Sequence, residues 1–194
     1  MWRSVSPRWL ALLAAMLVTS DPAAAAQVLP FDTAHSRVGF ELRTRWGQHL
    51  RGEFPAYEGE VRVYPDGRRD VRVHLDSTRM HIVGNRRYTR WAKGPDFFDI
   101  ANFPVIRFVS ETYDAALLHA GGALHGTLTM RDVSRPVRFV LEPAACDQPG
   151  VACDVVASGE VDRTDFGMDD WRVAVGDTVR FELRVRTLGL AETP

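Results

Sequence analysis

Long apolar runs are scarce in this 194-residue sequence. The one pronounced run, WLALLAAMLV, lies close to the N-terminus, and no second run of that kind follows. It is short for a membrane helix, which needs about 20 apolar residues. The sequence therefore predicts no integral membrane span in the mature chain.

The N-terminal segment has the features of a secretory signal peptide. Arg3 and Arg8 precede the apolar run, and Ala24 and Ala26 fit the small-residue pattern of a cleavage site. No cysteine follows at that point, which argues against a lipid-anchored form. We expect residues 1–26 to be removed and residues 27–194 to form one exported domain, with a retained N-terminal anchor as the alternative.

An excess of charge of either sign is also absent. The chain has 24 basic and 25 acidic residues, and removing Arg3, Arg8 and Asp21 leaves 22 and 24, a net charge of −2. A protein that binds nucleic acid usually carries a basic face to meet the phosphates. No nucleic-acid partner is therefore expected.

Signatures of catalysis and metal binding are missing as well. The six histidines are scattered without an H-E-x-x-H pattern, and no G-x-S-x-G sequence is present. We therefore expect no catalytic residues, no cofactor and no metal site. His35, in the sequence D-x-x-H-S, is a candidate either for capping the end of a strand or for touching a ligand's polar head.

Cysteine is rare, with Cys146 and Cys153 flanking the sequence DQPGVA. In an oxidising compartment such an isolated pair is typical of a disulfide, and Pro149-Gly150 indicates a turn between them. The bond is expected to clip the two arms of a hairpin, worth about 2–3 kcal/mol in the chain-entropy model. A redox dithiol or a metal site is the less favoured reading.

What the sequence does have is short segments in which apolar and polar residues alternate. In the last of them, Val179, Phe181 and Leu183 share one face while charged residues occupy the other. This period of two predicts antiparallel strands with one face in water, and hence an all-β fold. Eight strands are predicted, at about residues 36–42, 58–64, 70–76, 105–113, 122–130, 135–143, 153–162 and 178–187.

One interval, residues 80–103, lacks this alternation. Asn85 can cap a helix and Gly94-Pro95 can end it, so we predict a short helix from about Asn85 to Lys93. An irregular segment with Phe97 and Phe98 follows. Eight strands can close as a sandwich or as a barrel, and periodicity alone does not separate the two.

Several blocks of the sequence resemble one known family. They are FDTAHSRVGFEL with WGQHLRGEF, DFFDIANFPVIRFVSE, GTLTMRDVSRPVRF, ASGEVDRTDFGMDDW and VGDTVRFELRV, in this order from about Phe31 to Leu188. The family is the YceI-like family, lipocalin-like periplasmic proteins associated with polyisoprenoid binding. Two departures are that residues 88–91 replace a charged R-D-x-H run and that Asp132 replaces a turn glycine, a change that Asp tolerates.

The resemblance implies a single antiparallel, lipocalin-like eight-stranded β-barrel with a short helix and a lid segment around a hydrophobic tunnel. It places in or over that tunnel the residues Phe97, Phe98, Phe103, Phe166, Met168 and Trp171. The alternating strands add the inward-facing residues Phe40, Leu75, Phe108, Leu128, Met130, Phe139 and Phe181. His35 is kept as a ligand-contact candidate.

The expected function is that of a periplasmic carrier for a long apolar lipid, such as a polyisoprenoid or an isoprenoid quinone. An apolar tunnel selects by shape, and each buried methylene contributes about 0.8 kcal/mol. Two alternatives stay open: an enzyme acting on a prenyl or acyl lipid, and a packed barrel serving as an interaction protein in the cell envelope. The oligomeric state is open too, including a homodimer.

Overall fold

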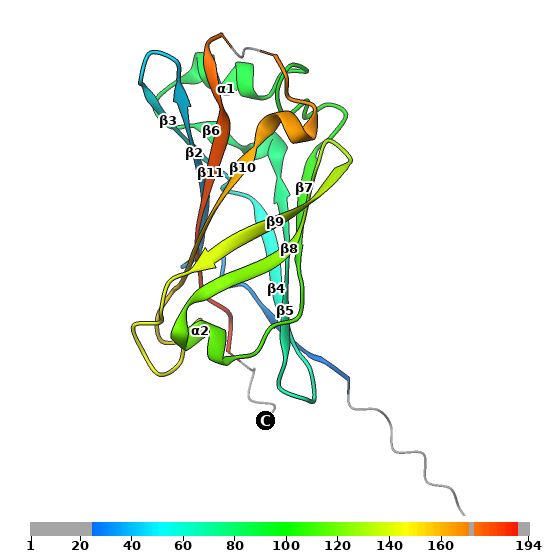
Figure 1. Cartoon of the computed structure of the whole chain (residues 1–194), viewed down its shortest axis with the longest axis vertical. Helices are drawn as coiled ribbons and strands as arrows, with labels where there is room; N and C mark the ends of the chain where they lie inside the picture. Colours follow the sequence, from blue (N-terminus) through cyan, green and yellow to red (C-terminus); the bar gives the residue numbers. More distant parts are fainter. Residues whose placement is uncertain (1–24, 171–172, 190–194) are drawn as a thin grey trace, which may run out of the picture.

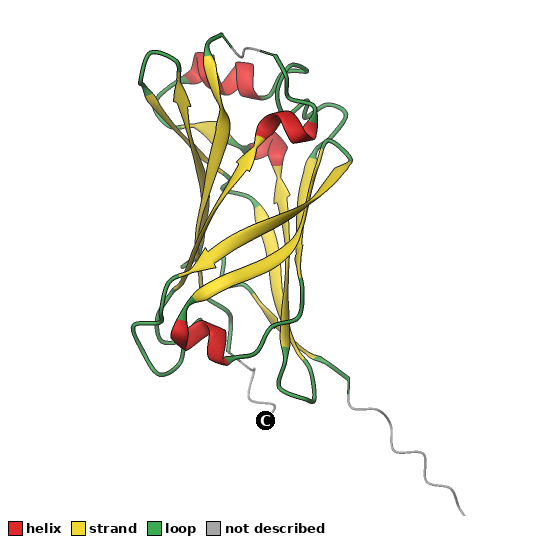
Figure 2. Cartoon of the chain, in the orientation of Figure 1, coloured by secondary structure: helices red, strands yellow, loops and turns green. Residues whose placement is uncertain are grey.

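The structure of the protein is a computed structural model that describes residues 25–170 and 173–189. An antiparallel sheet curls into an elongated, lipocalin-like barrel, with the helical segments at its two ends (Figures 1 and 2). The predicted all-β fold class is confirmed. Within the described ranges, no helix is long and apolar enough to cross a membrane.

Eight strands coincide with the alternating segments of the sequence. They are β2 (Arg37–Thr44), β4 (Tyr57–Val63), β5 (Arg69–Asp76), β7 (Val105–Ser110), β8 (Gly122–Met130), β9 (Val133–Leu141), β10 (Val155–Asp162) and β11 (Val175–Val185). Three further strands are β1 (Gln27–Pro30), β3 (His49–Glu53) and β6 (His81–Ile82). The predicted number is too low because these three strands are short and carry too few alternating residues to be recognised.

The order of the strands shows how the sheet closes. It runs β1-β4-β5-β7-β8-β9-β10-β11-β2-β3-β6, with antiparallel neighbours throughout. A bridge between Phe31 and Thr187 joins the chain after β1 to the chain after β11, and the N–H of Leu188 donates to the Pro30 carbonyl at 2.8 Å. One curled sheet, not two stacked ones, therefore surrounds the interior.

The helical segments mark the two ends of the barrel. Helix α1 (Arg86–Ala92) begins after Asn85, whose side chain accepts a hydrogen bond from the Tyr88 N–H, as predicted. The 3-10 turns η1 (Ser77–Arg79) and η2 (Arg163–Phe166) begin in a similar way, after Asp76 and Asp162, whereas helix α2 (Ala116–Ala120) has no side-chain cap. Helix α1 and η2 lie at one end, called here the α1 end, and α2 lies at the opposite α2 end (Figure 2).

The hairpin turns use the residues that the sequence indicates. Gly67, in the predicted turn between β4 and β5, has a φ of 82°. Between β8 and β9, Arg131 and Asp132 both adopt positive φ, at 50° and 57°. Asp132 therefore takes the left-handed conformation for which a glycine is usual, because its short polar side chain tolerates it.

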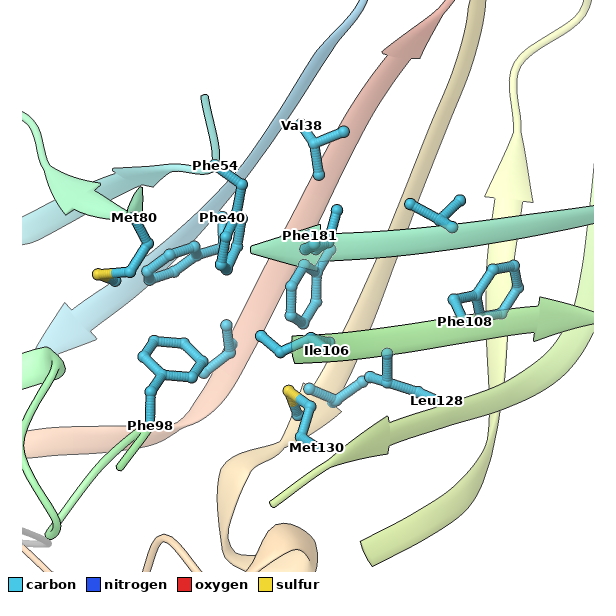
Figure 3. Packing of buried hydrophobic residues seen from close by; sticks show 14 of the residues in the cluster. Val38, Phe40, Phe54, Met80, Phe98, Ile106, Phe108, Leu128, Met130 and Phe181 are labelled. Carbon is cyan, nitrogen blue, oxygen red and sulfur yellow. The ribbon is translucent and has the colours of Figure 1, made fainter. Parts of the chain in front are cut away.

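Aromatic side chains fill the half of the barrel next to α1. Figure 3 shows the rings of Phe40, Phe54 and Phe98 turned toward one another with Met80 beside them. The Phe40 ring centroid lies 5.4 Å from that of Phe54 and 5.7 Å from that of Phe98. Phe97 packs edge-on against Phe98 at 5.3 Å, so both adjacent phenylalanines contribute to this packed half.

A buried arginine holds the α1 end together. The Arg163 side chain is fully buried and donates to the carbonyls of Met168, Asp170 and Gly176, the last two at 2.7 and 3.1 Å. It also pairs with the Asp177 carboxylate at 3.1 Å, and its guanidinium lies 5.6 Å from the centre of the Phe97 ring. The DRTDFGM block therefore positions an internal cation that connects η2, the following loop and β11.

Candidate ligand cavity

A cavity of about 380 Å³ occupies the half of the barrel next to α2. Its volume falls within the range of about 300–1,000 Å³ that is typical of small-molecule sites. The walls are built mainly from the inward-facing apolar residues of β4, β5, β7, β8, β9, β10 and β11. Alternation along these strands explains the apolar wall, because every second side chain of a strand points to the same face.

Five of the predicted ligand-contact residues line this cavity: Leu75, Phe108, Leu128, Phe139 and Phe181. Phe108 on β7 and Phe139 on β9 lie on the two strands that flank β8, and their ring centroids are 5.0 Å apart in an edge-on arrangement. The structure therefore brings these predicted residues together around one space.

The other predicted contact residues lie elsewhere. Buried in the packed half, and outside the cavity lining, are Phe40, Phe97, Phe98, Met130, Phe166 and Met168. Phe103 is half-buried, with the Arg131 guanidinium 5.9 Å from its ring centre. Trp171 lies outside the described residues.

In place of a tunnel along the whole barrel, the structure has a cavity in the half next to α2. Phe181 belongs to the cavity lining, yet its ring centroid is only 6.3 Å from that of Phe40 in the aromatic cluster. The aromatic side chains thus form the inner end of the cavity. Sequence alternation identifies inward-facing residues but does not show which of them meet across the barrel and which leave space.

Several lining residues are not among the predicted ligand contacts, although the alternation along their strands marks them as inward-facing. Val71 and Val73 alternate with Leu75 on β5, and Ile106 alternates with Phe108 on β7, so all lie on the same wall. The loop residues 147–151 also border the cavity, and no periodicity could have indicated them.

The mouth of the cavity lies at the α2 end. His119 of α2 and the loop residues Asp147, Gln148 and Val151 belong to the lining and are exposed to solvent. The turn between β4 and β5 lies at the same end (Figure 1). A ligand entering between these elements would reach the aromatic end of the cavity last.

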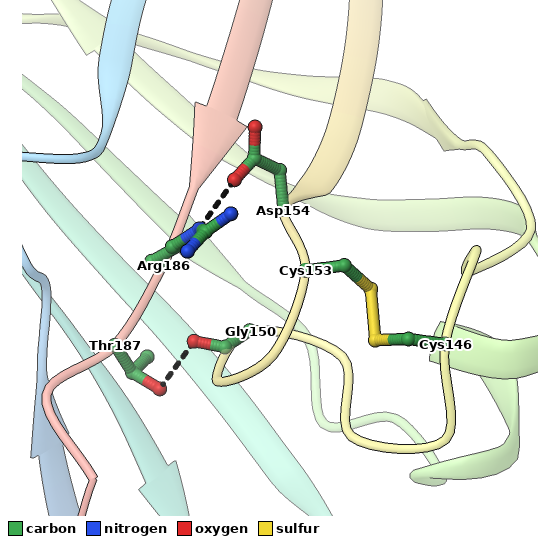
Figure 4. The surroundings of a disulfide bond; sticks show 6 residues. All are labelled: Cys146, Gly150, Cys153, Asp154, Arg186 and Thr187. Atoms are coloured by element: carbon green, nitrogen blue, oxygen red, sulfur yellow. Dashed lines mark hydrogen bonds and ion pairs between the residues drawn. A yellow bond between two sulfur atoms is a disulfide. The ribbon is translucent and has the colours of Figure 1, made fainter.

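A disulfide closes the loop at this mouth. Cys146 and Cys153 are bonded, as predicted, in the connection between the paired strands β9 and β10. The Gly150 carbonyl accepts hydrogen bonds from the N–H and the hydroxyl of Thr187, at 2.7 and 3.1 Å (Figure 4). Arg186 pairs with Asp154 at 2.6 Å, so the loop is fixed to the chain that follows β11.

Two of the polar residues in the lining lie side by side. Arg69 and Tyr113 both line the cavity and form an antiparallel bridge, with each N–H donating to the other's carbonyl at 2.9 and 2.8 Å. Burial raises the pKa of Tyr113 from 10.0 to about 12, although the positive charge of Arg69 acts in the opposite direction. The phenol therefore stays protonated at neutral pH and can donate a hydrogen bond.

His35 does not border the cavity. Its Nδ1 lies 2.6 Å from the Asp32 carboxylate, and the side chain is 65% exposed. The hydrogen bond from His35 lowers the pKa of Asp32, whose carboxylate also accepts from the Ala34 N–H. The geometry is that of a local turn before β2.

No cluster of three or more His, Cys, Asp or Glu side chains that could hold a metal ion is found in residues 25–170 and 173–189. The polar groups of the lining are instead dispersed around the mouth. The chemistry that the arrangement offers is burial of apolar surface, with a few donors at the entrance.

Comparison with known proteins identifies the same fold. A family model described as a YceI-like domain matches residues 30–187. No curated protein matches the sequence. The crystal structure of Burkholderia cenocepacia BcnA is similar with a TM-score of 0.65 and 20% identity, over 80% of this chain and 98% of that one.

Two further solved structures are similar. A polyisoprenoid binding domain from Saccharophagus degradans, implicated in plant cell wall breakdown, has a TM-score of 0.59 and 11% identity, over 81% of this chain and 95% of that one. The Campylobacter jejuni YCEI protein has a TM-score of 0.53 and 18% identity, over 71% and 84% respectively. At these identities the likenesses show a shared fold.

Proposed function

Because the chain belongs to the YceI-like family and its barrel contains an apolar cavity, we propose that the protein binds and carries a lipid with a long apolar chain. The apolar cavity is the observation that carries this proposal. The polyisoprenoid-binding description of the Saccharophagus degradans domain supports a prenyl chain as the ligand.

The energetics favour a chain over a small polar ligand. An apolar wall offers few hydrogen bonds, so affinity must come from buried carbon, at about 0.8 kcal/mol for each methylene. Association and chain ordering cost several kcal/mol or more, so about ten buried carbons are needed before binding becomes tight. The closed aromatic end limits how much of the chain the cavity holds, and the remainder would extend through the mouth.

Two features support a periplasmic location. The N-terminal residues fit a secretory signal peptide, and strand β1 begins at Gln27, directly after the proposed cleavage site. The Cys146–Cys153 disulfide fits an oxidising compartment, where such bonds persist. A carrier in that compartment would shield an apolar chain from water between membranes.

Binding without catalysis agrees with the chemistry of the lining. Tyr113, with its pKa raised to about 12, is a weak acid and donates a hydrogen bond more readily than a proton. The hydroxyl of Thr187 donates to the Gly150 carbonyl and is not directed to a base. Neither of these two lining residues offers a base or a readily released proton, which supports binding as the role of the cavity.

The proposal is tested by extracting protein purified from its native compartment with organic solvent and analysing the extract by mass spectrometry. A prenyl or other long-chain lipid in stoichiometric amount is expected. In parallel, lipid-stripped protein should bind farnesol, measured by isothermal titration. Empty protein from repeated preparations, together with no affinity for farnesol, farnesoic acid or farnesyl phosphate, would refute the proposal.

A further inference from the structure

One basic side chain lies in the wall of the apolar cavity. Arg69 is the first residue of β5, and Val71, Val73 and Leu75 follow it at intervals of two. All four residues line the cavity, as expected for side chains on one face of a strand. The guanidinium therefore stands at the mouth end of the same wall that the apolar chain would follow.

The positive charge of Arg69 is not neutralised within the described part of the chain. Its Nε is buried and has no hydrogen-bond partner there. No hydrogen bond or ion pair of its guanidinium is found among those residues, whereas Arg62 on β4 and Arg68 in the adjacent turn are each paired with an aspartate. The Arg69 side chain is partly buried, and a cation that is partly withdrawn from water without a partner favours binding of an anion.

The nearest acid in the sequence, Asp70, does not serve Arg69. Neighbouring residues of a strand point to opposite faces. The Asp70 carboxylate accepts hydrogen bonds from Arg62 and Tyr64, each at 2.5 Å. These two hydrogen bonds hold Asp70 on the outer face of the sheet, and the Arg69 side chain is left facing the interior.

A second donor lies beside Arg69. Because Arg69 and Tyr113 are directly opposite in an antiparallel bridge, their side chains lie on the same face. Both belong to the cavity lining. The guanidinium has only N–H donors, and the protonated phenol adds one O–H donor. The two groups can therefore both donate hydrogen bonds to an incoming oxygen.

We propose that Arg69 and Tyr113 form a head-group subsite at the mouth of the cavity, which selects lipids whose head is an anion, a carboxylate or a phosphate. The inference rests on the proposed function and specifies the ligand class. The apolar chain points toward Phe181 and the aromatic cluster, while the anionic oxygens accept hydrogen bonds from Arg69 and Tyr113. Asp147 also belongs to the cavity lining and is exposed, and its negative charge opposes the binding of an anion.

An anion is favoured over a neutral acceptor because of charge. A hydrogen bond to a charged partner is roughly twice as strong as one between neutral groups, and a guanidinium binds carboxylate or phosphate oxygens through two parallel N–H groups. A neutral head such as an alcohol would leave the partly buried charge of Arg69 without a counter-charge. We expect an affinity preference of about 10- to 100-fold for an anionic over a neutral head on the same chain.

The test compares three ligands with one prenyl chain: farnesyl phosphate, farnesoic acid and farnesol. Isothermal titration of lipid-stripped protein gives the three dissociation constants. The wild type is expected to bind both anions about 10- to 100-fold more tightly than farnesol, and the better of the two anions identifies the head-group chemistry. Arg69→Gln should remove the preference, so that its three dissociation constants lie within about threefold of one another.

Arg68→Gln is the matched control, because it removes one positive charge from an exposed neighbouring side chain outside the cavity lining. It should keep the preference, and Tyr113→Phe should reduce it in part. Equal affinity of the wild type for farnesol and the two anions would overturn this inference and leave the proposed function intact. Loss of the preference in Arg68→Gln as well would also overturn it, by showing a general effect of net charge.

The wild-type comparison needs no variant, so the inference stays testable if Arg69→Gln fails to fold by circular dichroism. Failure of all three ligands to bind, with protein that is empty on purification, would refute the proposed function and the head-group subsite with it. Equal binding of the three ligands would refute the subsite alone, so the two failures are distinguishable.

Discussion

Filling the cavity should affect stability and binding in opposite ways. Val73 lines the cavity, whereas Val179 lies in the packed half; both are valines on strands, and both are 3% exposed. Val73→Phe adds four carbons that can occupy free space, worth up to about 3 kcal/mol at 0.8 kcal/mol per carbon. The free energy of unfolding should therefore stay unchanged or rise by up to about 3 kcal/mol.

The same substitution at Val179 has no space to fill. Overpacking of a close-packed core costs about 1–3 kcal/mol, so Val179→Phe should lower the free energy of unfolding by that amount. Binding should change the other way: Val73→Phe should weaken farnesol binding at least about tenfold, since several buried methylenes are displaced. Val179→Phe should leave the binding of the folded protein within about threefold.

Both variants are measured on lipid-stripped protein, because a ligand that binds only the native state would raise the apparent stability. Urea denaturation gives the free energy of unfolding and isothermal titration gives the affinity. Equal destabilisation by the two substitutions would refute the reasoning about free space. Full farnesol binding by Val73→Phe would show that the chain binds elsewhere.

Three further predictions concern the framework around the cavity. Arg163→Met should lower the free energy of unfolding, measured by urea denaturation, by about 3–5 kcal/mol, because buried carbonyls and a carboxylate lose their cation. The control Arg180→Met, on the exposed face, should change it by less than about 0.5 kcal/mol. Serine at both Cys146 and Cys153 should cost about 2–3 kcal/mol, and reduction of the wild type should give the same loss. The pKa of Tyr113 is raised from 10.0 to about 12, so its contribution to stability is complete below pH 10 and is lost as the pH rises to about 12. Tyr113→Phe should remove this alkaline loss of stability, which is about 3 kcal/mol. The same alkaline loss in Tyr113→Phe as in the wild type would contradict the assignment of the loss to Tyr113.

The strands with clear alternation were predictable because the period of two is a local property. β5, β8 and β11 carry apolar side chains at most of their inward-facing positions, and burial of that face fixes their register. The cap at Asn85 and the turn at Gly67 are also local, since each depends on the conformation of one or two residues. By contrast, β6 has only two residues, and its pairing with β3 is decided by tertiary contacts.

The site was predictable only in part. Leu75, Phe108 and Phe181 share the inward face with Phe40, and nothing in their sequence spacing separates them. What separates them is the tertiary arrangement, in which Phe98, from a segment distant in sequence, packs on Phe40 and fills one half of the barrel.

The sequence by itself determined the all-β class, the eight alternating strands, the disulfide and the family, because each depends on residue type at short spacing or on blocks in a fixed order. Only the tertiary structure decided where the interior is packed and where it is hollow, because side-chain volumes from distant strands must be added in space. It alone also placed Arg69 beside Tyr113 at the cavity mouth, since that contact depends on the pairing of the chain after β7 with the start of β5.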